Sequence, residues 1–402
     1  METLDLFPLD VECSIYGMTT FDGNILVSTS NCKVYCITFN KFKPHIREIE
    51  FAYIPNGAKI MLISALQRDK DDYVIAITHS KSTIYYLNLY VSGSSHPKLD
   101  LDQLAQGCQT IRLKYVPYHL YPTTASTGPG KRSPCWLLSG GDNRIHIFIE
   151  DEKSFEEKPI EDYYPELEVT FDCPALWIDV LNFNDNKERA VALSFENGSV
   201  RLFYSSWNAT EGNYNLVENW RFEEYTTIVP CVRLFRIKNS NSSSDTRTKL
   251  GRLNVINSDT STAQSINLLL VSSTNSCLVF EDIIKNGLAA KRELPDSQRL
   301  DCNTTAAIGD TNFDGRNELV IGNHGRELLF YRYDVSSCAY ELDRVQDFNN
   351  PIYSIAMLDI TKDGLNDICI LLSNGVMILQ SSVQDAIDIC RKRVGAILSK
   401  MM

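Results

Sequence analysis

Two short segments in the C-terminal third of the sequence place oxygen-bearing side chains at a spacing suited to cation binding. In the first, Asp310, Asn312, Asp314 and Glu318 occupy positions 1, 3, 5 and 9 around Gly315. Calcium takes about six to eight oxygen ligands at flexible angles, and a glycine permits the tight turn that folds alternate side chains and one carbonyl inward. This segment therefore predicts a calcium-binding loop.

The second segment repeats the arrangement with Asp359, Thr361, Asp363 and Asp367 around Gly364. Asp and Gly also form hydrogen-bonded turns without any metal, so a calcium loop and a simple turn are both open interpretations of the two segments. A third stretch, 177–189, lies at the same place in its repeat but has Leu181 where a ligand belongs, and we predict that it binds no metal.

The elements that must position these segments belong to a pattern that recurs seven times along the chain. Each copy has three or four apolar residues, a small or hydroxyl residue, a polar turn and a second apolar stretch, which is typical of a β-hairpin. The small or hydroxyl residues are Ser28, Thr78, Ser139, Ser194, Ser272, Gly322 and Ser373. Their shortest separations are about 50 residues, the length of one four-stranded propeller blade. We therefore predict an all-β, seven-bladed β-propeller over residues 1–380.

Two intervals between copies are longer than the others, and the ring also has to be closed. The long intervals contain segments rich in Pro, Gly, Ser, Thr or Asn, about 122–134 and 238–265, which we predict to be surface insertions. The seventh copy ends at Gln380 with no outermost strand of its own. We expect residues 4–11 to complete the last blade.

From about residue 381 the apolar spacing changes to that of an amphipathic α-helix, predicted over 381–402. One apolar stripe consists of Val383, Ile387, Cys390, Val394, Ile397 and Met401. Ser382 with Asp385 matches a capping box, which supports a helix start there. The stripe either packs on the chain's own propeller or docks a partner protein.

Composition excludes several broad classes. The 402 residues are 44% hydrophobic and 22% charged, enough for a buried core, and a net charge of -12 argues against nucleic acid as a partner. Twelve cysteines without a Cys-x-x-Cys pair do not indicate a disulfide scaffold. The sequence has no apolar stretch of about 18 residues, which argues against insertion into a membrane. Residues 1–8 lack the features of a secretory leader, so we expect an intracellular protein.

Catalytic motifs are missing from the sequence. We find no His-Glu-x-x-His, no Gly-x-Ser-x-Gly and no complete phosphate-binding loop, and the histidines are scattered without ligand spacing. We therefore predict that the protein is not an enzyme. A hydrolase with its site in the central channel is the alternative, and it would need a linked polar cluster there.

The two acidic segments resemble the calcium-binding FG-GAP repeats of integrin α-chain propellers, whose pattern is Asp-x-Asp-x-Asp-Gly-x-x-Asp. Asn312 and Thr361 depart from that pattern because they replace an acidic residue. The resemblance implies two sets of calcium ligands. They are Asp310, Asn312, Asp314, the Arg316 carbonyl and Glu318, and separately Asp359, Thr361, Asp363, the Leu365 carbonyl and Asp367.

Longer strings are similar to those of the kaptin family of propeller proteins. They are residues 51–60, 101–108, 136–148 and 155–167, together with both acidic segments and their following strands as far as Gln380. The resemblance implies a non-catalytic adaptor in the KICSTOR complex, which pairs with another FG-GAP propeller and contacts other KICSTOR subunits. Such an adaptor helps to recruit the GATOR complex to lysosomes and restrains TOR signalling when nutrients are scarce. The alternative it implies is an actin-associated protein at motile cell edges.

Overall fold

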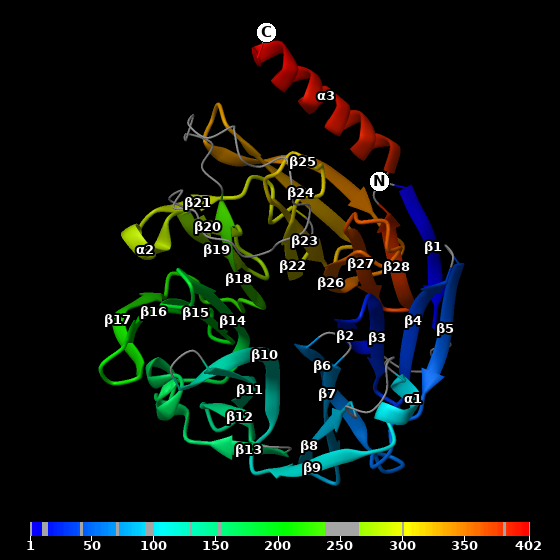
Figure 1. Ribbon diagram of the computed structural model, residues 1–402, viewed down its shortest axis with the longest axis vertical. Coiled ribbons are helices and arrows are strands. Elements are labelled where there is room, and N and C mark those ends of the chain that lie inside the picture. Colours follow the sequence, from blue (N-terminus) through cyan, green and yellow to red (C-terminus); the bar gives the residue numbers. More distant parts are fainter. Residues whose placement is uncertain are drawn as a thin grey trace.

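The recurring hairpins form the middle strands of a ring of small sheets. The structure is a computed structural model that describes residues 2–9, 15–40, 43–69, 72–92, 100–128, 131–151, 154–237, 265–299, 301–380 and 383–401. Across these residues the strands form seven antiparallel four-stranded sheets, which are the blades of a β-propeller (Figure 1). The predicted all-β, seven-bladed architecture is confirmed.

The blades follow one another along the chain. Blade 1 contains β2 (Ile15–Phe21), β3 (Asn24–Thr29), β4 (Val34–Asn40) and β5 (Lys43–Ile49); blade 2 contains β6 (Lys59–Asp69), β7 (Asp72–Lys81), β8 (Ile84–Val91) and β9 (Cys108–Leu113). Blade 3 contains β10 (Pro117–Gly128), β11 (Lys131–Gly140), β12 (Ile145–Asp151) and β13 (Ser154–Lys158); blade 4 contains β14 (Ala175–Phe183), β15 (Glu188–Phe195), β16 (Val200–Asn208) and β17 (Asn213–Phe222). Blade 5 contains β18 (Cys231–Ile237), β19 (Ser265–Val271), β20 (Leu278–Phe280) and β21 (Lys291–Glu293). Blade 6 contains β22 (Asn303–Gly309), β23 (Glu318–Asn323), β24 (Glu327–Asp334) and β25 (Ala339–Asp347), and blade 7 contains β26 (Ile352–Leu358), β27 (Asp367–Leu372), β28 (Gly375–Gln380) and β1 (Glu2–Pro8).

The first strand of each blade faces the central axis, where β2, β6, β10, β14, β18, β22 and β26 contact their neighbours around the ring (Figure 1). Because all pairs within a blade are antiparallel, its successive connections alternate between the two faces of the ring. The first-to-second and third-to-fourth strand connections lie on one face, which we call the acidic-loop face. The second-to-third strand turns and the links between blades lie on the opposite face.

The hydrophobic core is divided among the seven junctions between adjacent blades. Each cluster of buried side chains draws on two neighbouring sheets; for example, Ile25 and Val27 of blade 1 pack with Leu371 and Ile378 of blade 7. The second strands are therefore buried on both of their faces, which is why they appear in the sequence as unbroken apolar runs.

The recurring small residue has a packing role, which Gly322 illustrates. A side-chain Cβ at Gly322 would lie 2.6 Å from Cγ2 of Ile352, the first residue of the inner strand of the next blade. That distance is well inside van der Waals contact, so only a very small residue fits without moving the neighbouring blade. The small residue at Gly322 thus identifies the point where blade 6 approaches blade 7.

The ring is closed by the N-terminal strand, as predicted. β1 pairs antiparallel with β28, and the register runs from Glu2 opposite Gln380 to Pro8 opposite Gly375. Leu9 follows the strand, is buried in the core between blades 7 and 1, and donates its backbone N–H to the Asn374 carbonyl at 3.3 Å. The strand begins and ends slightly earlier than the expected range 4–11, whose last two residues lie outside the described part of the chain.

The interpretation of 122–134 as an irregular surface insertion is wrong. β10 and β11 extend through this segment as a paired hairpin, from Pro122 opposite Trp136 to Gly128 opposite Lys131. Its Thr and Ser residues satisfy their backbone groups across the hairpin, so the segment is ordered without a large apolar content. The other expected insertion, 238–265, lies outside the described residues except for Ser265, which begins β19.

The predicted C-terminal helix is present as α3 (Val383–Met401), but the apolar stripe is exposed at the positions whose side chains the structure describes. The side chains of Val383, Ile387 and Val394 are 47%, 40% and 55% exposed, whereas Ala386 is buried. The C-terminal end of α3 projects beyond the ring (Figure 1), so the described part of the stripe does not pack on the propeller. Residues 381, 382 and 402 lie outside the described residues.

The remaining helical segments are short: α1 (Leu101–Leu104), α2 (Ile283–Asn286) and the 3-10 turns η1 (Ile160–Asp162) and η2 (Pro165–Leu167). None of the helices in the described residues is both long and apolar enough to cross a membrane.

Deleting residues 1–9 should lower the melting temperature of the whole protein by several degrees or more, because blade 7 loses its outermost strand and the core loses Leu9. A chain truncated after Arg391, in the projecting helix, is the control and should melt close to the full-length protein. Calorimetry of the three proteins would contradict this account if the deletion left the transition unchanged.

Candidate functional site

The first acidic segment forms the connection between β22 and β23 on the acidic-loop face. Glu318 is the first residue of β23 and is 3% exposed, while Asp310 and Asp314 belong to the connection. One carboxylate oxygen from each of the three lies within 4.8 Å of the others. Two ligands of a single calcium ion are at most about 5 Å apart, because each lies about 2.4 Å from the metal. The structure therefore brings these three predicted ligands close enough to share one ion.

Hydrogen bonds within the loop also favour the alternative of a metal-free turn. The backbone N–H of Gly315 donates to Asp310 at 2.8 Å, and that of Arg316 donates to Asp314 at 2.8 Å. The Asn312 side chain donates from its amide nitrogen to Glu318 at 2.8 Å, while its oxygen accepts the Asp314 N–H. In this arrangement the amide nitrogen of Asn312, rather than its oxygen, faces the Glu318 carboxylate.

The buried position of Glu318 gives the loop an electrostatic preference for a positive charge. The pKa of Glu318 is raised to about 7, chiefly by burial. Donation from the Thr311 backbone opposes this shift, and the charges of Asp314 and Asp310 contribute to it. A cation bound among the three carboxylates would compensate both the burial and the mutual repulsion. The residues present therefore fit a calcium ion.

The second acidic segment repeats the turn but not the cluster. The Gly364 N–H donates to Asp359 at 2.9 Å and the Leu365 N–H donates to Asp363 at 2.9 Å, as in the first loop. Thr361 donates to the fully buried Asp367 at 3.3 Å. Within the described chain, which includes this whole segment, Asp359, Asp363 and Asp367 do not gather as Asp310, Asp314 and Glu318 do.

The third stretch, 177–189, is not a comparable loop. β14 continues through Leu181 to Phe183 and a short turn leads into β15. Asp179 lies within β14 and directs its carboxylate at the neighbouring blades. A strand therefore lies where the other two repeats have their acidic loop.

A linked polar cluster centred on Asp179 of β14 lies among the inner strands of the ring. Its carboxylate accepts the Tyr121 hydroxyl of blade 3 at 2.9 Å and the Leu234 N–H of blade 5 at 2.6 Å. The Arg233 guanidinium lies 4.5 Å from the Trp177 ring and donates to the Ala306 carbonyl of blade 6 at 3.2 Å. These contacts join the inner strands of four consecutive blades.

His119 completes this cluster as a neutral side chain. Its ring stacks on Trp177, and its Nδ1 accepts the Ile178 N–H at 3.2 Å. Burial, together with the nearby positive charge of Arg233, lowers the pKa of His119 to about 3. Burial raises the pKa of Asp179, with Arg233 opposing the shift. These contacts commit Asp179 and the His119 Nδ1 to donors from the neighbouring strands.

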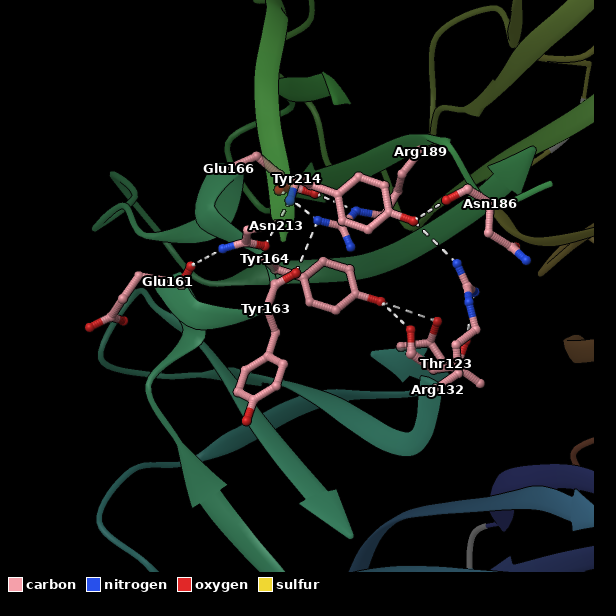
Figure 2. A network of polar contacts seen from close by, with 11 residues as sticks. Thr123, Arg132, Glu161, Tyr163, Tyr164, Glu166, Asn186, Arg189, Asn213 and Tyr214 are labelled. Atoms are coloured by element: carbon pink, nitrogen blue, oxygen red, sulfur yellow. Dashed lines mark hydrogen bonds and ion pairs between the residues drawn. The ribbon is translucent and has the colours of Figure 1, made fainter. Parts of the chain in front are cut away.

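A second buried network lies between blades 3 and 4 and is centred on Arg189 at the start of β15 (Figure 2). Arg189 is 1% exposed and pairs with Glu166 of η2 through two hydrogen bonds of 2.7 and 2.8 Å. Its guanidinium lies between the rings of Tyr164 and Tyr214, 3.8 and 3.9 Å from their centroids. Bidentate hydrogen bonding to a carboxylate and aromatic stacking on both faces of the group are the contacts that suit a desolvated guanidinium.

Further hydrogen bonds extend this network to the long hairpin. Arg132 of β11 donates to the Tyr214 hydroxyl at 3.2 Å, which donates to the Asn186 carbonyl at 2.5 Å (Figure 2). Tyr164 donates to the Thr124 carbonyl at 3.1 Å. The segment misread as an insertion is thus held by the same contacts that fix the blade 3 to blade 4 junction.

Sequence reasoning did not find the roles of Arg189 and Glu166. The string 155–167, one of the most specific in the sequence, contains both Tyr164 and Glu166, so its distinctive residues do have a structural purpose. An arginine at the start of an apolar strand was the available signal, but its partner could be identified only from the fold.

The chain is similar in sequence to the proteins of one family. A sequence model of the family "KICSTOR complex protein kaptin" matches residues 1–391. A protein of Mus musculus with the description "KICSTOR complex protein kaptin" is 27% identical over 401 residues, covering 95% of this chain and 88% of the mouse protein. The family match includes the closing strand, all the described blades and the first half of α3.

Solved structures with little sequence identity share the propeller. The structure of U3-55K is 10% identical and has a TM-score of 0.54, covering 92% of this chain and 96% of that one. The RRP9 WD40 repeats are also 10% identical, with a TM-score of 0.55 over 95% of this chain and 100% of theirs. At this identity the likeness shows the fold alone.

Calcium should raise the melting temperature of the wild-type protein, because binding to the folded loop stabilises it by about 2.7 kcal/mol at a hundredfold excess over Kd. Asp310→Ala should abolish that rise, whereas Asp359→Ala should retain it, since only the first loop gathers three carboxylates. A calcium titration followed by scanning fluorimetry checks this, with magnesium as the control ion. No rise for the wild type would favour the hydrogen-bonded turn.

Replacing Arg189 with Met should destabilise the protein by about 3–5 kcal/mol, because Glu166 is left buried and unpaired. The double variant Arg189→Met with Glu166→Leu should recover part of that loss, since neither charge remains. Denaturant unfolding of the two variants and of Glu166→Leu alone closes the cycle. Equal stability of the single Arg189 variant and the wild type would show that the ion pair is not structurally important.

Proposed function

The chain belongs to the kaptin family, and on that basis we propose that it is a non-catalytic scaffold subunit of a KICSTOR complex. The observation that carries the proposal is the family match, which runs from residue 1 to residue 391 and so includes the whole ring. In this role the chain pairs with a second FG-GAP propeller and contacts the other KICSTOR subunits. Together they help to recruit the GATOR complex to lysosomes and restrain TOR signalling when nutrients are scarce.

The arrangement of polar groups supports binding rather than chemistry. Among the inner strands, Asp179 accepts donors from two neighbouring blades, and in the second network Arg189 is enclosed by Glu166 and two tyrosine rings. These groups join blades to one another, which stiffens the ring. A rigid ring presents two broad faces of loops, the usual location of binding residues on a stable scaffold.

We propose that the exposed stripe of α3 is one of the surfaces that contact another subunit of the complex. Val383, Ile387 and Val394 lie in sequence with helical spacing and are exposed to 47%, 40% and 55%. Apolar residues grouped on one helix face favour burial against a protein partner. Arg391 is exposed beside the stripe, so the complementary surface is an apolar groove with an acidic group at its rim.

Affinity purification of the tagged chain from fed and starved cells, followed by mass spectrometry, tests the scaffold role. We expect a second propeller protein and GATOR components to copurify under both conditions. Absence of all of these proteins would contradict the proposal. Cosedimentation of the purified chain with actin filaments separately tests the actin-associated alternative.

The double variant Ile387→Asp with Val394→Asp should reduce recovery of the partner subunits by about tenfold or more, because charges replace buried apolar contacts at the interface. Its melting temperature should be unchanged, since the stripe is exposed in the free chain. Gln384→Asp, which places the same side chain at another exposed position of α3, is the matched control. Full recovery with the double variant would exclude the stripe from the interface.

A further inference from the structure

The outermost strand of blade 4, β17, exposes aliphatic side chains at the outer edge of the ring (Figure 1). Leu216 and Val217 are 46% and 49% exposed. In the other outermost strands, wherever the structure describes the side chains, the exposed positions hold charged or polar residues or proline, such as Glu341 and Asp343 of β25. Charges of that kind protect a sheet edge from contact with other chains. Among these strands, β17 is therefore the one whose surface is suited to a partner.

A β-bulge lies at the same point of β17. Tyr204 of β16 is opposite Glu218, while the next residue, Ser205, is opposite Leu216. Val217 therefore has no residue opposite it. Such a bulge interrupts the regular edge to which a further strand would have to pair. The geometry thus favours recognition through side chains over the addition of a strand.

Two arginines face each other across β16 and β17, on the side of the sheet that packs against blade 3. Arg201 is directly opposite Arg221, and Phe203 of β16 belongs to the buried cluster between blades 3 and 4. Leu216 is opposite Ser205 and so lies on the same side of the sheet, because side chains alternate along each strand. Like charges directly opposite each other destabilise a sheet. The fold alone therefore does not account for the arginine pair.

Arg201 is the unusual member of this pair. It is 7% exposed, yet it forms no hydrogen bond, ion pair or ring contact with any other residue that the structure describes. Burial and the charge of Arg221 lower the pKa of Arg201, and the charges of Asp172 and Glu223 oppose that shift without forming an ion pair with it. A buried charge without a partner is costly. An incoming anion would supply the partner that the chain itself does not provide.

Arg221 is available to the same anion. Its side chain is 55% exposed and lies 3.5 Å from Glu223, which is itself 59% exposed. An ion pair in water contributes little to stability, so Arg221 can exchange this partner for another at small cost.

The charges around the two arginines indicate which anion fits. The planar donor set of a guanidinium matches the two oxygens of a carboxylate. Asp172 and Glu223 already place negative charge near Arg201. Their repulsion disfavours a doubly charged phosphoryl group more than a singly charged carboxylate. Leu216, on the same side of the sheet, offers an apolar contact to residues next to the acid.

We propose that Arg201 and Arg221 form a docking site for an acidic side chain, glutamate or aspartate, on a segment of a partner protein. The carboxylate binds between the two guanidinium groups, and an aliphatic residue of the same segment packs against Leu216 and Val217. The inference rests on the proposed function only in that the occupant is another protein.

The test selects binders from a random library of displayed peptides on the purified full-length chain, with counter-selection on the double variant Arg201→Met with Arg221→Gln. Its outcome does not depend on whether KICSTOR subunits copurify, so failure here and failure of the scaffold role are distinguishable. We expect the selected peptides to combine glutamate or aspartate with an aliphatic residue. Replacing the acidic residue of a selected peptide with its amide should weaken binding by about tenfold, as expected for loss of a charge-assisted hydrogen bond.

Single variants of the chain show whether the arginines contact the acid directly. Arg201→Met and Arg221→Gln should each weaken peptide binding by about tenfold. Arg332→Met, which removes an exposed arginine opposite Glu341 in blade 6, is the matched control and should change binding by less than about twofold. On the Arg201→Met chain, the change from acid to amide in the peptide should also cost less than about twofold, because the two groups act as a pair.

The melting temperature separates a binding role from a structural one. Arg201→Met should melt at or above the wild-type temperature, because a buried charge without a partner and its repulsion by Arg221 are removed. A lower melting temperature, failure to select any binder, binders without acidic residues, or a full amide effect on the Arg201→Met chain would overturn the proposal. A dimer of the chain that Arg221→Gln dissociates in analytical ultracentrifugation would also overturn it, because the occupant would then be a second copy.

Discussion

Backbone pairing between β1 and β28 is the constraint on which the rest of the structure depends. It joins residues from the two ends of the propeller, so blade 7 is complete only when the chain has returned to its start. Each junction between blades has its own buried cluster, and closure ensures that every blade is flanked on both sides. A closed ring of this kind leaves few free edges and holds its loops in fixed positions. Those fixed loops are what a scaffold protein offers its partners.

Polar contacts reinforce part of the ring. Blades 3 to 6 are joined by Asp179 and Arg233 near the axis, and blades 3 and 4 are joined again by Arg189 and Glu166 further out. Asp179, Arg189 and Glu166 are buried and Arg233 is half-buried. Each charge is offset by hydrogen-bond donors, acceptors or aromatic rings directed at it, because an isolated buried charge would be destabilising.

The fold could be predicted from the sequence because its signals are local and repeated. The apolar runs around Ser28 or Gly322 identify the two middle strands of a blade, and the missing outer strand after Gln380 identifies the need for closure. The long hairpin of β10 and β11 was missed because its Thr, Ser and Pro residues are typical of loops, and only pairing across the hairpin orders them. The spacing of Val383 and Ile387 predicted a helix face, but a spacing alone does not determine what covers that face.

The candidate sites also divide into features that the sequence predicts and features that only the structure shows. The oxygen-rich spacing around Gly315 and Gly364 was visible in the sequence, yet only the structure separates a loop that gathers three carboxylates from one that does not. The partners of Arg189, which are Glu166, Tyr164 and Tyr214, come from segments distant along the chain. No periodicity connects such residues, so sequence patterns could not place them together.

Cross-linking mass spectrometry of the chain isolated in its native assembly tests the scaffold account most directly. The account predicts cross-links that join Lys81, on the face opposite the acidic loops, and Lys392, on α3, to lysines of a second propeller protein. Cross-links confined to this chain, with neither lysine joined to another protein, would contradict it.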